Sequence, residues 1–382
     1  MPLRILIDAR HIQDFGFGTY IRNLVRAISA IGSPHKYILV CGKKDQPEFD
    51  GLSDHFQVLP YERKDSELFD QFAFPAFARG VRADLIHIPL NVVPLFLPRP
   101  YIVTVHDLSA FFFDAPETWR LELVRARMRR GLMRASRVIA VSESTRQDAE
   151  QMLGIPSNRI TRIYGAADPR YTRLDPAADT ERRLTLERYQ IKYPFLLYTG
   201  SVKPQKNVAR LVEAFALVRG DLEHHPVYKD LRLIIIGDQI STSPSLRQAV
   251  LHSRVESRVR FLGFVPFETL RVFYASAAAF VFPSLYEGFG LPPLEAMASG
   301  TPVVSSNVTS LPEVAGDAAY FVNPDNVFEI ARGIKEVLLD EDLREKLVSR
   351  GFQQCRRFNW EDTARQVLAT YECAGMGRDK PV

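Results

Sequence analysis

Two glutamates and the glycines between them form the stretch of this sequence that is best suited to chemistry. Glu287 and Glu295 enclose a segment with Gly288, Gly290 and two consecutive prolines, and an apolar run precedes them. Glycines let the backbone approach a ligand closely, and prolines suit the first turn of a helix. The free N–H groups of a helix start attract anions, and the helix dipole favours negative charge there. The pattern predicts a diphosphate site flanked by two carboxylates that reach different parts of one elongated ligand.

The same stretch resembles the E-x7-E signature of the retaining glycosyltransferases of family 4. In that family the first glutamate engages the donor sugar and the second binds the ribose hydroxyls, which gives these roles to Glu287 and Glu295. The resemblance also assigns donor contacts to the backbone amides of Gly288, Phe289, Gly290 and Leu291. The simpler alternative is that both glutamates are first-turn residues favoured by the helix dipole. The glycines, aromatic residue, prolines and spacing occur together here, which favours the family interpretation.

A second loop carries the predicted counter-charge for the diphosphate. The run from Gly200 to Asn207 follows an apolar segment and resembles the glycine, basic-residue and Lys-Asn phosphate loop of family 4. The resemblance makes Lys206 the candidate that neutralises the leaving diphosphate, and it places Ser201 at the donor. Ser201 and Gln205 stand where the family often has basic residues, so it stays open whether Lys203 supplies that charge. The alternative for Lys206 is a solvated surface lysine.

Near the N-terminus, Asp8-Ala9-Arg10 followed by Gly16 and Gly18 resembles a further family loop. In the family this loop lies under the donor phosphates and beside the acceptor, so the resemblance makes Gly16 and Gly18 donor-side residues. A plain turn and helix start is the alternative. A dinucleotide site is disfavoured, because Ile21 stands at the third glycine position and the second strand ends at Cys41 without a ribose-binding acid.

Three further positions follow predicted strands. His106 ends the apolar run 101–105, and ligands of open α/β folds bind at such carboxyl ends. Alone it would be a structural histidine, but the resemblance matches it to the histidine that approaches the donor sugar near the reacting carbon. Ser142-Glu143-Ser144 matches another family turn, or else a helix N-cap. The resemblance places the nucleotide base near Val265, mainly through backbone contacts.

Two charged segments offer other chemistry. Asp340-Glu341-Asp342 looks like a D-x-D metal motif but lies outside the predicted site, so we expect a helix cap and no metal site. The arginine-rich segment Trp119 to Arg137 is interleaved with apolar residues. It could lie on an anionic membrane or hold a lipid-linked acceptor, and a solvated helix face is the alternative.

Composition describes a folded protein of more than one domain. The chain has 382 residues, more than one hydrophobic core usually organises, with 46% hydrophobic and 25% charged residues. A net charge of +4 suits an anionic substrate or a membrane surface but does not argue for nucleic acid. The three cysteines show no C-x-x-C pairing, so neither disulfides nor zinc are expected and a cytoplasmic location is the simplest expectation. We expect no signal peptide and no membrane span, since no apolar run approaches about 18 residues.

The elements that must position these residues form two βαβ series, the pattern of parallel sheets covered by helices. The first half predicts strands at 3–8, 37–41, 85–88, 101–105 and 138–141, and the second half at 195–199, 231–236, 259–262, 279–282 and 302–305. The proline-containing, charged run 168–194 is the best linker candidate. We therefore expect an acceptor-side domain at 1–175 and a nucleotide-sugar domain at 176–359. Similar proteins imply a C-terminal helix, at about 360–382, that crosses back to the first domain.

Together these features predict the α/β GT-B fold, with two Rossmann-like domains whose parallel sheets face an interdomain cleft. The expected activity is retaining, metal-independent transfer of a hexose to a glycan or lipid-linked acceptor, without a cofactor besides the nucleotide-sugar substrate. The loop around Lys206 and the Asp8-Ala9-Arg10 start look most like bacterial mannosyltransferases of polysaccharide assembly. GDP-mannose is therefore the first guess and a UDP-sugar the other. The alternatives are a nucleotide-sugar epimerase, a sugar phosphorylase or a non-catalytic donor-binding subunit.

Overall fold

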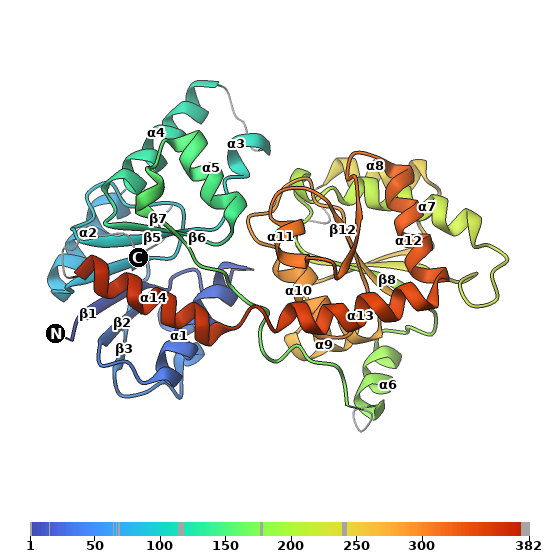
Figure 1. Cartoon of the computed structure of the whole chain (residues 1–382), viewed down its shortest axis with the longest axis horizontal. Coiled ribbons are helices and arrows are strands. Elements are labelled where there is room, and N and C mark those ends of the chain that lie inside the picture. Colours follow the sequence, from blue (N-terminus) through green and yellow to red (C-terminus); the bar gives the residue numbers. More distant parts are fainter. Residues whose placement is uncertain are drawn as a thin grey trace. The chain divides into compact units, whose positions relative to one another are not determined.

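The chain forms two compact units in the computed structural model of Figure 1, which describes residues 2–14, 16–63, 65, 67, 69–113, 118–175, 179–238 and 243–375. One unit contains Met1–Ala166 and Phe358–Val382, and the other contains Ala167–Arg357. The predicted boundary at residue 175 lies inside the second unit. The reason is that Tyr171 packs on Phe267 and Tyr274, with ring centroids 4.8 and 5.3 Å away.

A seven-stranded sheet in the order β3-β2-β1-β4-β5-β6-β7 forms the first unit, and all neighbouring strands are parallel. The strands are β1 (Arg4–Asp8), β2 (Lys36–Cys41), β3 (Phe56–Pro60), β4 (Leu85–Ile88), β5 (Tyr101–Val105), β6 (Arg137–Ala140) and β7 (Ile160–Arg162). The apolar runs predict all of them except β3 and β7. These two edge strands are only partly buried and lack a continuous apolar run, so the apolar pattern of the sequence does not indicate them.

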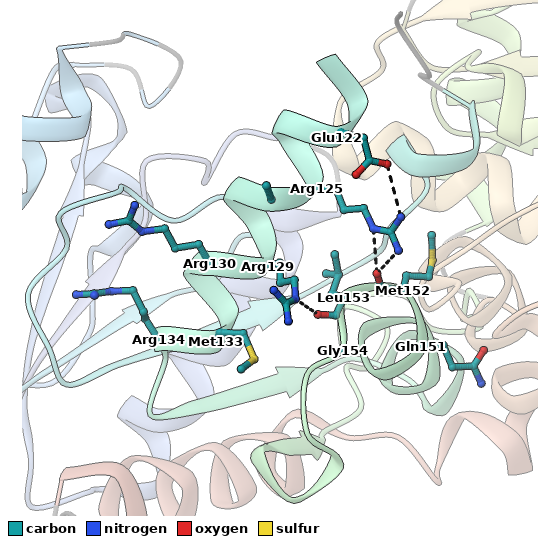
Figure 2. A pocket seen from close by; sticks show the side chains of 11 residues that line it. Glu122, Arg125, Arg129, Arg130, Met133, Arg134, Gln151, Met152, Leu153 and Gly154 are labelled. Atoms are coloured by element: carbon teal, nitrogen blue, oxygen red, sulfur yellow. Dashed lines mark hydrogen bonds and ion pairs between the residues drawn. The ribbon is translucent and has the colours of Figure 1, made fainter. Parts of the chain in front are cut away.

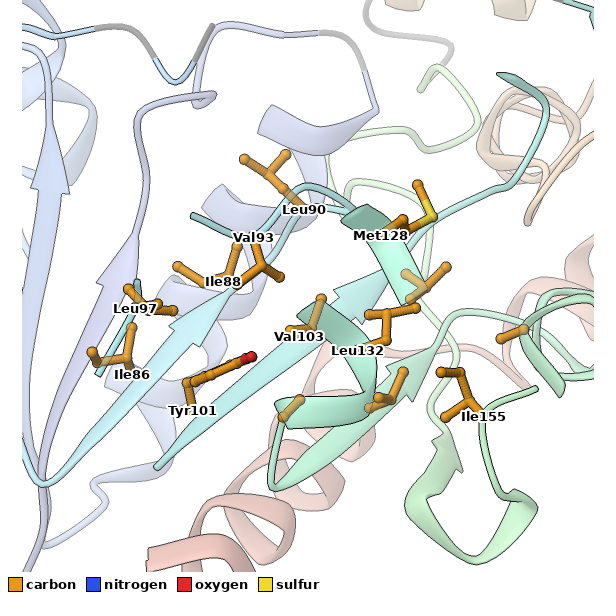
Figure 3. Packing of buried hydrophobic residues seen from close by; sticks show 14 of the residues in the cluster. Ile86, Ile88, Leu90, Val93, Leu97, Tyr101, Val103, Met128, Leu132 and Ile155 are labelled. Carbon is orange, nitrogen blue, oxygen red and sulfur yellow. The ribbon is translucent and has the colours of Figure 1, made fainter. Parts of the chain in front are cut away.

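Helices cover this sheet. They are α1 (Phe17–Ile31), α2 (Asp70–Val81), α3 (Ala110–Phe113), α4 (Thr118–Arg134), α5 (Glu143–Leu153) and α14 (Trp360–Gly375), with 3-10 turns η1 (Lys43–Phe49) and η2 (Ser157–Arg159). Figure 3 shows part of the core, where Ile88 of β4 and Val103 of β5 belong to one buried cluster with Leu132 of α4. Burial of such side chains is the main source of the unit's stability.

The terminal helix α14 is part of the first unit and packs beside α1 (Figure 1). Its Tyr371 hydroxyl lies 2.7 Å from Nδ1 of the buried His87, whose Nε2 lies 2.8 Å from Thr104 Oγ1. Thr363 Oγ1 donates to the Tyr164 carbonyl oxygen at 2.7 Å. These buried polar contacts fix the helix in one register, because leaving any of these groups unpaired would cost free energy.

The second unit holds a six-stranded parallel sheet in the order β10-β9-β8-β11-β12-β13. Its strands are β8 (Phe195–Thr199), β9 (Arg232–Ile236), β10 (Val259–Gly263), β11 (Ala279–Phe282), β12 (Val303–Ser306) and β13 (Ala319–Val322). Its helices are α6 (Asp179–Arg188), α7 (Val208–Asp221), α8 (Pro244–His252), α9 (Phe267–Ser276), α10 (Leu291–Ala298), α11 (Leu311–Ala315), α12 (Val327–Leu339) and α13 (Glu341–Cys355), with the 3-10 turn η4 (Pro204–Lys206). The prediction of two Rossmann-like units with parallel sheets is confirmed, while β13 was missed at the sheet edge.

Candidate active site

The helix after Glu287 begins where the sequence predicts it. α10 starts at Leu291 after Gly290, whose φ of 114° lies in the left-handed region that glycine adopts readily. A Cβ at Gly290 would meet Leu311 Cδ2 at 2.9 Å, so a side chain there would also be crowded. The two prolines that follow Leu291 carry no N–H, so this helix start can offer an anion only the amides that precede them.

Lys206 and Glu287 are in direct contact at this edge of the second sheet. Lys206 Nζ donates to both carboxylate oxygens of Glu287, at 2.7 and 2.8 Å. The two side chains are 21% and 10% exposed, so the ion pair is largely shielded from water. They meet because they follow β8 and β11, which are paired parallel strands and therefore end at the same edge.

Backbone and side-chain hydrogen bonds hold the two loops together. The Leu285 N–H donates to the Gln205 carbonyl oxygen at 2.7 Å. Asn207 Nδ2 donates to the carbonyl oxygens of Pro283 and Pro324, at 3.0 and 2.8 Å. Asn207 is buried, so these bonds are exchanged little with water. The position of Lys206 relative to Glu287 is thus set by the backbone on both sides.

This contact changes how the two residues can act. The family resemblance predicts a phosphate contact for Lys206 and a sugar contact for Glu287. In the structure the two side chains form one ion pair. An ammonium group has three N–H donors, and two of those of Lys206 point at the carboxylate oxygens of Glu287. A diphosphate that approached Lys206 would therefore use the remaining N–H or share those that face Glu287.

Glu295 lies in the second turn of α10 and is buried. Tyr274 donates its hydroxyl hydrogen to Glu295 Oε2 at 2.9 Å, and the same hydroxyl lies 2.6 Å from Thr199 Oγ1. Burial raises the pKa of Glu295 to about 7, the Tyr274 hydrogen bond lowers it, and the charge of Asp168 raises it. No acidic residue occupies the first turn of α10, so the interpretation of both glutamates as first-turn residues is wrong.

The loops after β8, β9 and β10 stack on one another near Ser201 and Val265. The Gly200 N–H donates to the Ile236 carbonyl oxygen at 2.9 Å, and a Cβ on Gly237 would come within 1.8 Å of the Gly200 oxygen. Ser201 is partly exposed, and its carbonyl oxygen accepts from the Tyr198 hydroxyl at 2.9 Å. Val265 is buried as a whole residue, at 4% exposure, so the structure neither exposes its side chain nor singles out its backbone as a contact for a nucleotide base.

In the first unit, the predicted glycine loop leads into α1. A Cβ on Gly18 would lie 2.1 Å from the Ile12 carbonyl oxygen, so only glycine fits there. The Gly18 N–H donates to the Asp14 carbonyl oxygen at 2.8 Å, and Gly16 caps the helix with φ of 71°. Both predicted glycines are therefore needed by the turn itself.

Asp8 and Arg10 form a buried ion network that fixes the start of this loop. Arg10 Nε and Nη2 donate to the two Asp8 carboxylate oxygens at 2.9 and 2.7 Å, and Nη1 donates to Asp70 Oδ2 at 2.8 Å. The guanidinium also lies over the Phe74 ring, 4.1 Å from its centroid. These contacts use the charges of Asp8 and Arg10 internally, so their role is to hold the loop.

His106 lies beside the glycine loop. Its ring makes edge contacts with the rings of Phe17 and Tyr20, both at 4.8 Å between centroids. His106 Nε2 lies 3.1 Å from the Pro89 carbonyl oxygen, which can only accept, so Nε2 carries the proton and Nδ1 is the acceptor nitrogen. Burial lowers the pKa of His106 to about 4, against the opposing effects of Asp107 and the Pro89 bond. The imidazole is therefore neutral near pH 7.

Comparison with known proteins identifies the family. A family profile described as "Glycosyl transferases group 1" matches residues 186–354, and one described as "Glycosyltransferase Family 4" matches residues 16–171. The chain is 33% identical to O-antigen chain mannosyltransferase B of Escherichia coli over 377 residues, which is 94% of this chain and 96% of that protein. The chain belongs to glycosyltransferase family 4. It is a glycosyltransferase.

Two further similarities agree with this assignment. The serotype-specific mannosyltransferase WbdA of Escherichia coli is 33% identical over 236 residues, which cover 62% of this chain and 28% of that longer protein. The structure of Anabaena Alr3699/HepE in complex with UDP and glucose superposes with a TM-score of 0.76 at 18% identity, covering 97% of this chain and 99% of that one. The similarity to that structure concerns the fold and confirms the GT-B class.

Several residues around the candidate site are not predicted from the sequence. Tyr274 donates to Glu295, Thr199 contacts the Tyr274 hydroxyl, and the charge of Asp168 raises the pKa of Glu295. Tyr274 lies on the buried part of α9, so the sequence pattern indicates only an aromatic residue of the core. Asn207 lies inside the predicted phosphate loop, but nothing in its spacing indicates that it joins that loop to residues 283 and 324.

The remaining candidates take structural roles. Ser142 accepts from the Thr145 N–H at 3.0 Å and caps α5, and Asp340 accepts from the Leu343 N–H at 2.9 Å and caps α13. Both cap interpretations are confirmed. Within the described ranges, no group of three or more His, Cys, Asp or Glu side chains could hold a metal ion. In the same ranges no helix is long and apolar enough to cross a membrane.

Proposed function

We propose that this glycosyltransferase transfers mannose from GDP-mannose to a glycan or lipid-linked glycan of the O-antigen type, with retention of the anomeric configuration and without a metal ion. The observation that carries the reaction is the Lys206–Glu287 pair beside the start of α10, with Nζ to oxygen distances of 2.7 and 2.8 Å. The choice of mannose is supported by the relatives, since E. coli O-antigen chain mannosyltransferase B aligns over 94% of this chain.

The proposed reaction breaks the bond between the anomeric carbon and the diphosphate oxygen. The electron pair of that bond goes to the departing GDP, and Lys206 with the α10 start stabilises the added negative charge. The acceptor hydroxyl oxygen forms the new bond to the anomeric carbon. Its proton passes to the departing diphosphate. The sugar has oxocarbenium character between the two events, and Glu287 orients its hydroxyls.

Retention is proposed because neither glutamate is placed as a glycosidase-type nucleophile. Glu287 is engaged by Lys206 through both carboxylate oxygens, and Glu295 is buried against Tyr274. Retaining glycosidases need two carboxyl groups about 5–5.5 Å apart on either side of the bond, one of them free to attack. Attack from the face that the diphosphate leaves fits this site better. The metal-free character is supported by the cationic Lys206 and the helix-start amides, which supply the counter-charge themselves.

The donor is expected to bind mainly through the second unit. Glu295 would hold the ribose, the backbone near Val265 the base, and the amides from Gly288 to Leu291 the diphosphate. The acceptor would bind to the first unit. Cys41, Cys355 and Cys373 are free thiols, which fits a reducing compartment, so we propose a cytoplasmic location.

The test is a donor panel with the purified enzyme. We would incubate GDP-mannose, GDP-fucose, UDP-glucose and UDP-galactose with mannosylated oligosaccharide acceptors and follow nucleotide release and product by chromatography and NMR. GDP-mannose should be used at least tenfold better than the UDP-sugars, and the new linkage should be α from the α-linked donor. A preference for a UDP-sugar would reject the proposed donor, and a β-linkage would reject retention.

A further inference from the structure

One face of α4 joins exposed apolar side chains to exposed arginines. Trp119 and Leu123 are 58% and 61% exposed near the start of the helix, and Arg130 and Arg134 are exposed near its end. The spacing of these positions follows the helical repeat, so they share one stripe on the helix surface. The α4 sequence contains six arginines and a single glutamate. This stripe is apolar at one end and strongly basic at the other.

A groove lies beside the basic end of this stripe. It has a volume of about 760 Å³ and lies between α4 and the C-terminal end of α5. Its basic lining comes from Arg125, Arg129, Arg130 and Arg134, and its apolar lining includes Met133. Glu122 is the acidic residue of this lining, so the groove has an excess of positive charge.

The four arginines divide into two pairs, as Figure 2 shows. Arg125 Nε and Nη2 donate to the Met152 carbonyl oxygen at 3.1 and 2.7 Å, and Arg129 Nε donates to the Leu153 carbonyl oxygen at 3.0 Å. These bonds satisfy carbonyl groups at the end of α5, so the pair holds the two helices together. Arg130 and Arg134 extend from α4 away from the end of α5. Arg134 also hydrogen-bonds the Tyr101 hydroxyl, and its guanidinium keeps further N–H donors. Arg130 and these remaining donors of Arg134 are placed to meet something outside the chain.

We propose that the α4 stripe and its groove form a binding surface for anionic phospholipids, with Trp119 and Leu123 entering the headgroup boundary and Arg130 and Arg134 contacting lipid phosphates. Amphipathic helices that lie on membranes combine large apolar residues on one part of their surface with arginine or lysine on another. Arginine binds phosphate oxygens with two parallel N–H groups. The guanidinium pair thus complements phosphate charge, and the indole of Trp119 is suited to the interface.

Charge separates this surface from an ordinary solvated helix face. Exposed helices usually intersperse both signs, and pairs of opposite charge stabilise them. Near the middle and end of α4, Arg125, Arg129, Arg130 and Arg134 face only Glu122 within the groove. Holding like charges together costs energy in water, and a layer of lipid phosphates would offset that repulsion. The large apolar surface of Trp119 is also exposed, and a lipid headgroup layer would remove part of it from water.

Vesicle sedimentation tests the basic part of the surface. The whole protein is mixed, without donor or acceptor, with vesicles of phosphatidylcholine alone or with 30% phosphatidylglycerol, a composition chosen as roughly bacterial in its surface charge. Binding should require phosphatidylglycerol and fall as salt rises, because the Debye length shortens. Arg130→Ala/Arg134→Ala should bind about 30-fold more weakly, at roughly fivefold for each basic residue. Equal binding to neutral vesicles would overturn the proposal.

A matched pair of arginines controls for net charge. Arg182 and Arg183 of α6 have 50% and 63% exposed side chains in the second unit. Arg182→Ala/Arg183→Ala removes the same charge and should leave vesicle binding within about twofold of the wild type. If both double variants lose binding equally, the chain binds by net charge alone and the α4 surface is rejected. Circular dichroism and donor hydrolysis should be unchanged in both variants, which excludes misfolding as the cause.

Trp119 reports the apolar part of the surface. The chain has two tryptophans, and Trp360 is only 8% exposed, so vesicle-dependent changes in fluorescence come from Trp119. Lipids brominated on their acyl chains should quench this emission, and Trp119→Phe should abolish the response. Absence of quenching in the wild type would overturn the insertion of Trp119. Complete displacement from vesicles by millimolar glycerol phosphate would instead identify a site for small anions and reject the membrane surface. The vesicle-binding and fluorescence measurements do not depend on the identity of the sugar donor.

Discussion

Lys206 Nζ lies 2.7 and 2.8 Å from the two carboxylate oxygens of Glu287, although the residues are 81 positions apart. The contact arises because β8 and β11 are neighbours and end at one edge of the sheet. It makes the cationic and anionic groups of the proposed reaction dependent on each other. A change in one residue must alter the charge and position of the other.

Lys206→Ala should lower kcat by roughly 10²–10³, since removing one preorganised partner of a developing negative charge typically costs that much. Donor KM should change less, because the charge on the leaving diphosphate grows as the bond stretches. Lys206→Arg should restore only part of the rate, because the planar guanidinium approaches phosphate oxygens differently. Steady-state kinetics with saturating acceptor measures this. Wild-type turnover by folded Lys206→Ala protein would remove the leaving-group role.

The pair should also behave as a unit in a double-mutant cycle. Glu287→Gln should lower kcat, both because the sugar is oriented less well and because Lys206 loses its anchor. If the two side chains act only through their contact, Lys206→Ala/Glu287→Gln should lose little more activity than the more damaging single variant. Strictly multiplicative losses would show that the ion pair plays no part in catalysis. The matched control is Arg258→Ala/Asp230→Asn, which breaks an exposed ion pair of the same unit.

The sequence predicts the Gly288-to-Leu291 turn well because its requirements are local. The turn requires a left-handed φ, which Gly290 adopts readily, and the prolines favour a helix start. The conformation of the backbone there is therefore determined by adjacent residues. The same is true of Gly18, which no other residue could replace beside the Ile12 carbonyl oxygen. Strong apolar runs identify the central strands for the same reason.

Contacts between distant segments could not be predicted in this way. Tyr274 lies in the apolar pattern of α9, and the sequence does not show that its hydroxyl donates a hydrogen bond to Glu295 of α10. The bond between Tyr371 and His87 likewise joins residues 284 positions apart, and no spacing reveals it. β3 and β7 depend on the strands beside them rather than on their own hydrophobicity. The sequence therefore predicts the turns that follow β8 and β11 but not the residues that hold their side chains.

Metal removal gives an independent test of the proposed electrostatics. Because Lys206 and the α10 start supply the counter-charge, activity should survive prolonged treatment with EDTA within about twofold. Nucleotide release is measured before and after treatment, and again after addition of magnesium or manganese. Loss of activity that either ion restores would replace the metal-independent mechanism with a metal-assisted one.

The raised pKa of Glu295 predicts a pH-dependent stability. An acid whose folded pKa is about 7, against 4.5 for the ordinary group, stabilises the fold fully below pH 4.5 and loses that contribution as pH rises through about 7. Between pH 5 and 8 the wild-type free energy of unfolding should therefore fall, relative to that of Glu295→Gln, by an amount on the order of 1–3 kcal/mol, and its Tm should fall with it. Thermal denaturation of both proteins across this range measures the difference. Parallel curves would mean that Glu295 titrates normally.

The same titration should appear in donor binding. A ribose that donates hydroxyl hydrogens to Glu295 prefers the ionised carboxylate, so donor KM should fall as pH rises from 6 to 8. Glu295→Ala should raise donor KM by roughly 10–100-fold, the value of a hydrogen bond to a charged group, with kcat changed little because ribose contacts contribute equally in ground and transition states. Its KM should also be independent of pH. Unchanged donor KM in Glu295→Ala would reject the ribose contact.

Tyr274→Phe tests whether that carboxylate must be held in place. The substitution removes the hydroxyl that donates to Glu295 Oε2 at 2.9 Å and lies 2.6 Å from Thr199 Oγ1, while it keeps the aromatic ring that packs near Tyr171. Losing one hydrogen bond should raise donor KM by about 2–10-fold without a matching loss of kcat. The Tyr274 bond lowers the pKa of Glu295, so its loss should move the midpoint of the KM profile to higher pH. A purely structural tyrosine would lower Tm but leave that midpoint where it is.

Thr199→Val, which removes the partner of the Tyr274 hydroxyl but not the bond to Glu295, should shift the midpoint less than Tyr274→Phe. An equal shift in both variants, or none in either, would contradict a positioning role for Tyr274.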